Sequence, residues 1–105
     1  PGMVRHVVLL TFTDAATDAE IDGTATALRT LPDQIPELRH YVVGVDLGLA
    51  EDNADLQVVA DTDDVDGYLA YRDHPEHQRI IAEQIRPILA SRTAAQIALL
   101  TPRAT

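Results

Sequence analysis

The 105-residue sequence contains no cysteine, no tryptophan and no lysine. Without cysteine the chain has neither a disulfide nor a thiol nucleophile, a composition that fits a reducing compartment, and we expect a cytoplasmic protein. No apolar run approaches the roughly 20 residues that span a bilayer. The N-terminus also lacks the charged start and apolar stretch of a signal peptide. These absences predict a small globular domain with no membrane partner.

The charge of the chain is strongly acidic. Asp and Glu together number 17 against eight basic residues, all of them arginine, and the formal net charge is −9. A phosphate backbone would be repelled by such a chain, which excludes nucleic-acid binding through a basic face. Hydrophobic residues make up 46% of the sequence, enough for one core. We therefore expect a single domain over residues 3–105, with Pro1 and Gly2 as an expression remnant.

The hydrophobic pattern predicts the order β-α-β-β-α-β, with the second helix broken in two. Strands are expected over 4–12, 38–47, 56–60 and 94–101, and helices over 17–31, 63–72 and 75–87. Thr17 and Glu20 form a capping-box pattern that opens the first helix, and Thr62 or Asp63 should cap the second. Pro102 should stop the last strand. This order predicts a ferredoxin-like α+β fold, a four-stranded antiparallel sheet with helices on one face.

The first and last strands are apolar on both faces, whereas the helices can cover only one face of the sheet. An exposed apolar sheet face is unusual on a soluble monomer. The sequence therefore predicts a homodimer in which the sheets of two copies pack on one another. A cavity between the sheet and the helices is then the expected ligand site.

The segment DHPEH, residues 73–77, interrupts the second helix. Proline disfavours helical geometry in the residue before it, so His74 should leave the α region and cap the helix that Pro75 begins. His77 lies on the isoleucine face of that helix, and its ring is interpreted either as a local cap or as a functional group. A third interpretation is a divalent metal bound by the two histidines and a neighbouring carboxylate.

Four segments occur in a set order along the chain: RHVVLLTF (5–12), LP (31–32), GVD (44–46) and YRDHPEHQ (71–78). With them the sequence resembles the stress-responsive alpha/beta-barrel domain family, part of the dimeric α+β barrel superfamily. The resemblance extends from Val4 to Arg103. The resemblance implies a homodimer, in agreement with the first and last strands, which are apolar on both faces.

The resemblance also implies a chemistry. A plant member of the family is a polyketide cyclase, which closes a linear polyketide thioester by an intramolecular aldol condensation, and its functional positions match His6, Tyr71 and His77. By this likeness His77 would abstract a proton alpha to a carbonyl. Tyr71 would donate a hydrogen bond to the developing enolate, and His6 would bind or polarise the carbonyl. Such a step requires no metal or organic cofactor. An acidic residue beside the cyclase's base histidine falls on Leu99 here.

Each of these residues also has a structural interpretation. Tyrosine at helical spacing from Tyr68 is typical of a core or its rim, and a histidine between apolar strand residues is typical of a core with its hydrogen bonds satisfied. Two hypotheses therefore remain. The first is a small-molecule protein that acts on or binds an apolar carbonyl compound such as a polyketide intermediate. The second is a non-catalytic stress-response or ligand-binding homodimer.

Overall fold

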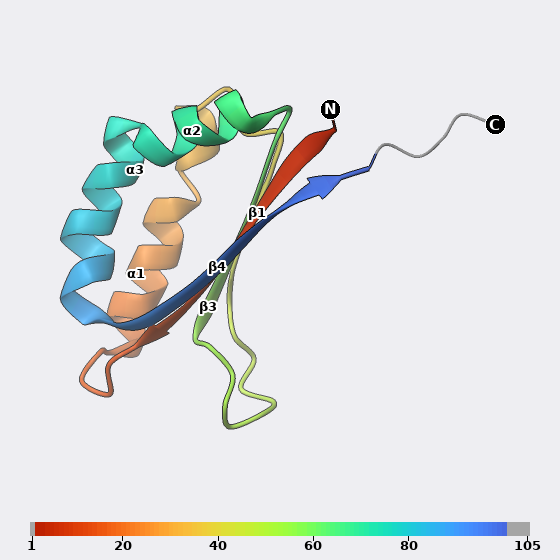
Figure 1. Cartoon of the computed structure of the whole chain (residues 1–105). Coiled ribbons are helices and arrows are strands. Elements are labelled where there is room, and N and C mark those ends of the chain that lie inside the picture. Colours follow the sequence, from red (N-terminus) through yellow and green to blue (C-terminus); the bar gives the residue numbers. More distant parts are fainter. Residues whose placement is uncertain (1, 101–105) are drawn as a thin grey trace.

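A four-stranded antiparallel sheet with the strand order β2-β3-β1-β4 forms one layer, and the helices form a second layer on one of its faces (Figure 1). The computed structural model describes residues 2–100. The strands are β1 (Met3–Phe12), β2 (His40–Val45), β3 (Leu56–Thr62) and β4 (Leu89–Leu99). The helices are α1 (Asp18–Leu28), α2 (Val65–Asp73) and α3 (Pro75–Ile80), with short turns at Leu31–Asp33, Ile81–Ile85 and Arg86–Ile88. The predicted ferredoxin-like α+β fold is confirmed.

The core lies between the helices and one face of the sheet, called here the inner face. Side chains alternate along each strand, and the buried members on β1 and β3 are Val8, Leu10, Phe12, Leu56, Val58 and Ala60. The antiparallel register sets these residues opposite one another, with Val8 beside Val58 and Leu10 beside Leu56. Burial of such side chains stabilises the fold by roughly 1.5–3 kcal/mol each.

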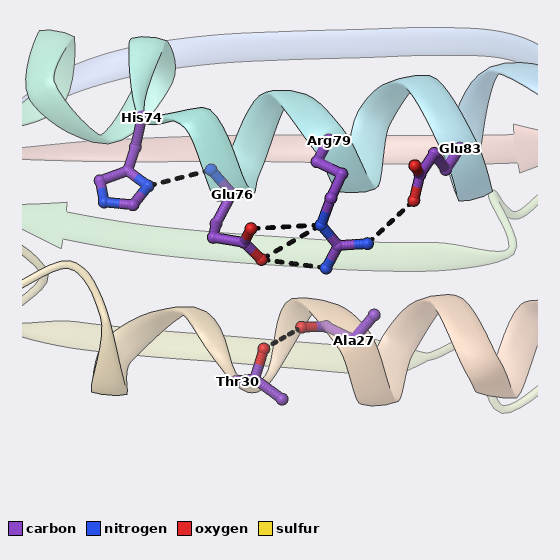
Figure 2. Close-up of polar contacts among 6 residues, drawn as sticks. All are labelled: Ala27, Thr30, His74, Glu76, Arg79 and Glu83. Atoms are coloured by element: carbon purple, nitrogen blue, oxygen red, sulfur yellow. Dashed lines mark hydrogen bonds and ion pairs between the residues drawn. The ribbon is translucent and has the colours of Figure 1, made fainter.

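The first helix is shorter than the sequence predicts. Its capping box is present, since Thr17 Oγ1 accepts from the Glu20 amide and the Glu20 carboxylate accepts from the Thr17 amide. The helix ends at Leu28 rather than Leu31, and the Thr30 hydroxyl donates to the Ala27 carbonyl at 2.7 Å (Figure 2). Leu31 is nevertheless fully buried, because the short turn that it begins returns its side chain to the core.

The second helix begins two residues later than predicted, at Val65. Asp64, not Thr62 or Asp63, is the N-cap of α2, and its carboxylate accepts from the Gly67 amide at 2.8 Å. Thr62 instead completes β3, where its hydroxyl donates to the Asp64 carbonyl. After α3 the chain continues as a single π-helical turn over Ile81–Ile85, called here the π turn. Such π-helical segments often accompany functional sites.

The last strand starts five residues before its predicted beginning, at Leu89 rather than residue 94. Its first residues mix alanine, serine and arginine, so the sequence there lacks the hydrophobic alternation that predicts a strand. Such a composition is tolerated because β4 is an edge strand with one side unpaired. Pairing with β1 places Arg92 beside Leu10 and Gln96 beside His6, so both polar residues share the inner face. Residue 101 and Pro102 lie outside the described residues.

Within residues 2–100 no helix covers the outer face of the sheet (Figure 1). This face exposes apolar side chains. Val42 of β2 is 60% exposed, Ile97 of β4 is 53% exposed, and Leu9 of β1 lies between them. The Arg5 guanidinium forms two hydrogen bonds of 2.9 Å with the buried Asp61 carboxylate on this face, which holds the pKa of Asp61 below its usual range. Within residues 2–100 no helix has the length and apolar character needed to cross a bilayer.

Candidate functional site

A cavity of about 260 Å³ lies between the inner face of the sheet and the helices. Its walls are mainly apolar side chains from β1, β3, β4, α1 and the π turn. Five lining residues are polar: His6, Tyr71, His77, Arg86 and Arg92. The fold thus brings the three residues predicted from the sequence to one cavity, although they come from β1, α2 and α3.

A larger hollow of about 490 Å³ lies on the outer face, beside the loop between β2 and β3. It is lined by Leu9, Val42 and Gln57 together with Asp46 and Asp52 of that loop or its edge. Among residues 2–100, no histidine, tyrosine or arginine lines it. The inner cavity instead combines two histidines, a tyrosine and two arginines, so it is the candidate functional site.

The break between α2 and α3 has the predicted form. His74 has an extended backbone conformation, with φ −61° and ψ 134°, and its ring Nδ1 accepts from the Glu76 amide at 3.1 Å (Figure 2). Pro75 then occupies the first turn of α3. Figure 2 also shows Arg79 bound to Glu76 and Glu83 along the exposed side of the helix. His74 is a cap, as predicted.

The same break fixes the imidazole of His77. Because α2 ends at Asp73, the carbonyl of Arg72 has no partner within the helix. His77 Nδ1 lies 3.0 Å from that carbonyl oxygen, and the Gln78 side chain also donates to it at 2.6 Å. A carbonyl can only accept, so Nδ1 carries the ring proton and Nε2 is left as an acceptor.

The His77 ring stacks on the ring of Tyr71, with centroids 4.2 Å apart and an interplanar angle of 26°. Burial lowers the pKa of His77, and this effect outweighs the opposing bonds to the backbone carbonyls of residues 71 and 72. The charge of Arg92 lowers the pKa of His77 further. The ring is therefore neutral at pH 7.

His6 is held in the opposite tautomer. Residue His6 is only 4% exposed, and its Nδ1 lies 2.8 Å from Nε2 of the Gln96 side-chain amide. An amide nitrogen only donates, so Nδ1 accepts and the ring proton is on Nε2. Burial lowers the pKa of His6 to about 4, with smaller contributions from Arg92 and His77. The inner face thus carries a neutral histidine whose free nitrogen is a donor.

Tyr71 is almost completely buried, and its hydroxyl lies 3.4 Å from that of Tyr41. Burial raises the pKa of Tyr71 to about 12 and raises the pKa of Tyr41 further. Both hydroxyls are therefore protonated at neutral pH. If Tyr41 donates to Tyr71, the Tyr71 proton is left for another acceptor.

The residue expected at the acidic position of the cyclase lies outside the cavity. Leu99 shares the outer-face alternation of Ile97, because its β1 partner is Met3, and it does not line the cavity. The group that orients His77 is a backbone carbonyl, that of Arg72, in place of a side-chain carboxylate.

Sequence reasoning missed three polar residues of the site: Arg86, Arg92 and Gln96. The signal for two of them was strand alternation, which would have placed Arg92 and Gln96 on one face had the strand been extended back to Leu89. For a metal, within residues 2–100 no three His, Cys, Asp or Glu side chains gather as a candidate ligand set.

Comparison with known proteins gives a consistent result. The family model described as the stress responsive A/B barrel domain matches residues 4–98. A dimeric ferredoxin-like protein of unknown function from Thermobifida fusca YX is 47% identical, with a TM-score of 0.86 over 93% of this chain and 92% of that chain. The search among curated proteins found no match.

More distant structures share the fold. A Dabb family protein with a ferredoxin-like fold from Mesorhizobium loti is 20% identical, with a TM-score of 0.79 over 96% of this chain and all of that one. The hydroxynitrile lyase from Passiflora edulis is 18% identical, with a TM-score of 0.81 over 99% of both chains. At these identities the likeness concerns the backbone arrangement.

Proposed function

Because the chain belongs to the stress-responsive A/B barrel domain family, we propose that it is a small-molecule protein whose cavity removes a proton alpha to a carbonyl. His77 is the base, and Tyr71 and His6 are donors to the carbonyl oxygen. The observation that carries the proposal is the pair of opposite histidine tautomers at one cavity. One neutral ring presents an acceptor and the other a donor, the two functions that enolate formation needs.

The proposed step follows from these groups. Nε2 of His77 takes the proton from the carbon next to the carbonyl, and the electron pair of that C–H bond moves to form the enolate. The oxygen gains negative charge and is stabilised by the Nε2–H of His6 or the hydroxyl of Tyr71. The enolate carbon can then attack a second carbonyl of the same molecule, which closes a ring by aldol addition. His77 returns its proton to the new alkoxide.

The environment supports this chemistry in two further ways. A lowered pKa keeps His77 unprotonated at neutral pH, as a base requires. The apolar walls exclude water and strengthen hydrogen bonds to a charged oxygen. The Passiflora edulis enzyme of the same fold is named as a lyase, and this name is compatible with a reaction at a carbonyl-derived centre.

An alternative is a non-catalytic ligand-binding role. The observation that favours it is the lack of any Asp or Glu among the cavity-lining residues. The base would then rely on a single imidazole held by a backbone carbonyl. A protein of this kind would bind the carbonyl compound through the same donors without exchanging its protons.

We also propose that the chain forms a homodimer through the outer face of the sheet. The exposed Leu9, Val42 and Ile97 would be covered by such a contact. The Thermobifida fusca protein that is 47% identical is described as dimeric.

Deuterium exchange at the alpha carbon of a ketone tests the proposed activity. Butyrophenone in D₂O at neutral pD would be followed by NMR with and without enzyme. Wild type should accelerate exchange, and His77→Gln should reduce the enzyme-dependent rate by about 10²-fold or more, the range of a general base. Equal rates for the two proteins would remove His77 as the base and favour the ligand-binding alternative.

The matched control is His40→Gln. This substitution is chemically the same, but His40 is 73% exposed on β2 and does not line the cavity. It should exchange at the wild-type rate. A reduction in both variants would show that the effect of His77→Gln does not come from the cavity.

A further inference from the structure

The arginines of residues 2–100 divide into two groups. Most are bound by the protein itself: Arg5, Arg39, Arg72 and Arg79 pair with carboxylates, and Arg29 donates to the Val43 carbonyl. Within the described part of the chain, Arg86 and Arg92 alone have side chains with no hydrogen bond or ion pair. Both line the inner cavity. Both residues are exposed, so their guanidinium groups are open to a ligand that enters the cavity.

The fold explains why these two residues remain free. Arg92 lies on the inner face of β4 beside Leu10, and Arg86 directly follows the π turn; both line the same cavity. No Asp or Glu lines the cavity, so its two guanidinium groups meet no opposite charge there. Arg92 also lies close enough to lower the pKa values of His6 and His77. The positive charge therefore belongs to the same cavity as the proposed base.

We infer that the cavity binds a carbonyl compound that carries a carboxylate, with the carboxylate on Arg92 and Arg86 and the carbonyl toward His6, Tyr71 and His77. This inference rests on the proposed function for the role of the carbonyl, and it adds the substrate class. Guanidinium suits a carboxylate because its donors form a planar fork that can make two parallel hydrogen bonds. A local pair of positive charges also offsets the repulsion that an acidic protein exerts on an anion.

The size of the cavity supports a small ligand. About 260 Å³ admits a compound with one ring or a short chain, and its walls between the polar groups are apolar. A suitable probe is 4-oxo-4-phenylbutanoate, which combines a phenyl ring, a ketone with an alpha methylene, and a carboxylate. Its amide, 4-oxo-4-phenylbutanamide, has the same shape and no charge.

Binding of the two probes would be measured by NMR titration with wild type, Arg92→Gln and the double variant Arg86→Gln/Arg92→Gln. Wild type should bind the acid about tenfold more tightly than the amide, as expected for charge-assisted hydrogen bonds at a partly exposed site. The double variant should lose this preference and bind both probes with similar affinity. Arg39→Gln removes an equal charge far from the cavity and should keep the wild-type preference.

The acid-to-amide ratio of wild type makes the test independent of variant folding. An acid that binds no better than its amide, or no binding of either probe, overturns the inference. A preference that survives in the double variant also overturns it. Exchange at the alpha methylene of the bound acid is measured separately. If wild type binds the acid with a preference that depends on Arg92 but does not accelerate this exchange, the proposed role of His77 as base is refuted and the carboxylate site stands.

Discussion

Mild acid should destabilise this protein through His6. The folded state holds the ring neutral, because burial lowers its pKa from 6.5 to about 4. The unfolded chain takes up the proton as the pH falls below 6.5, while the folded chain does not until about pH 4. Between these values the unfolded state binds more protons, so the free energy of unfolding decreases as the pH falls.

The magnitude follows from the two pKa values. At 1.36 kcal/mol for each pKa unit, moving from pH 7 to pH 5 should cost about 2 kcal/mol through this one residue. His77 acts in the same direction, since its pKa is also lowered. A loss of this size is a large part of the stability of a small domain.

Urea unfolding followed by circular dichroism at pH 7 and pH 5 measures the effect, with the protein concentration held constant because of the proposed dimer. His6→Gln should lose about 2 kcal/mol less than wild type between the two pH values. His40→Gln removes a histidine whose side chain is 73% exposed, and it should behave as wild type. If His6→Gln shows the full wild-type loss, burial of a neutral His6 is not the cause of the acid sensitivity.

Two further predictions concern the helix break and the outer face. His74→Ala removes the side-chain acceptor for the Glu76 amide, and the free energy of unfolding should fall by about 1 kcal/mol; an unchanged urea midpoint would show that the cap is not needed. Val42→Asp places a charge on the proposed dimer face and should yield monomers in light scattering at micromolar concentration. Val65→Asp changes an equally exposed valine on α2 and should leave the oligomeric state unchanged, and dimers in Val42→Asp would exclude that face.

Local signals in the sequence predicted the elements with short-range causes. Thr17 with Glu20 began α1, and the proline at 75 forced His74 out of the helix, because caps and pre-proline geometry depend on neighbouring residues. Elements whose limits depend on distant partners were predicted less well. β4 begins at Leu89 because β1 offers a hydrogen-bonding edge there, and no local pattern marks that residue.

The sequence by itself determined the fold class and the cap at His74, since both rest on residue type and spacing, and its resemblance to a known family indicated His6, Tyr71 and His77 as candidates. Only the tertiary structure decided how these residues meet. The backbone carbonyl of Arg72 and the side-chain amide of Gln96 set opposite tautomers on the rings of His77 and His6. Strand β4 brings Arg92 to the same cavity. These contacts join residues from different elements, so hydrogen-bond geometry in the folded chain, and not residue order, defines the chemistry that the cavity offers.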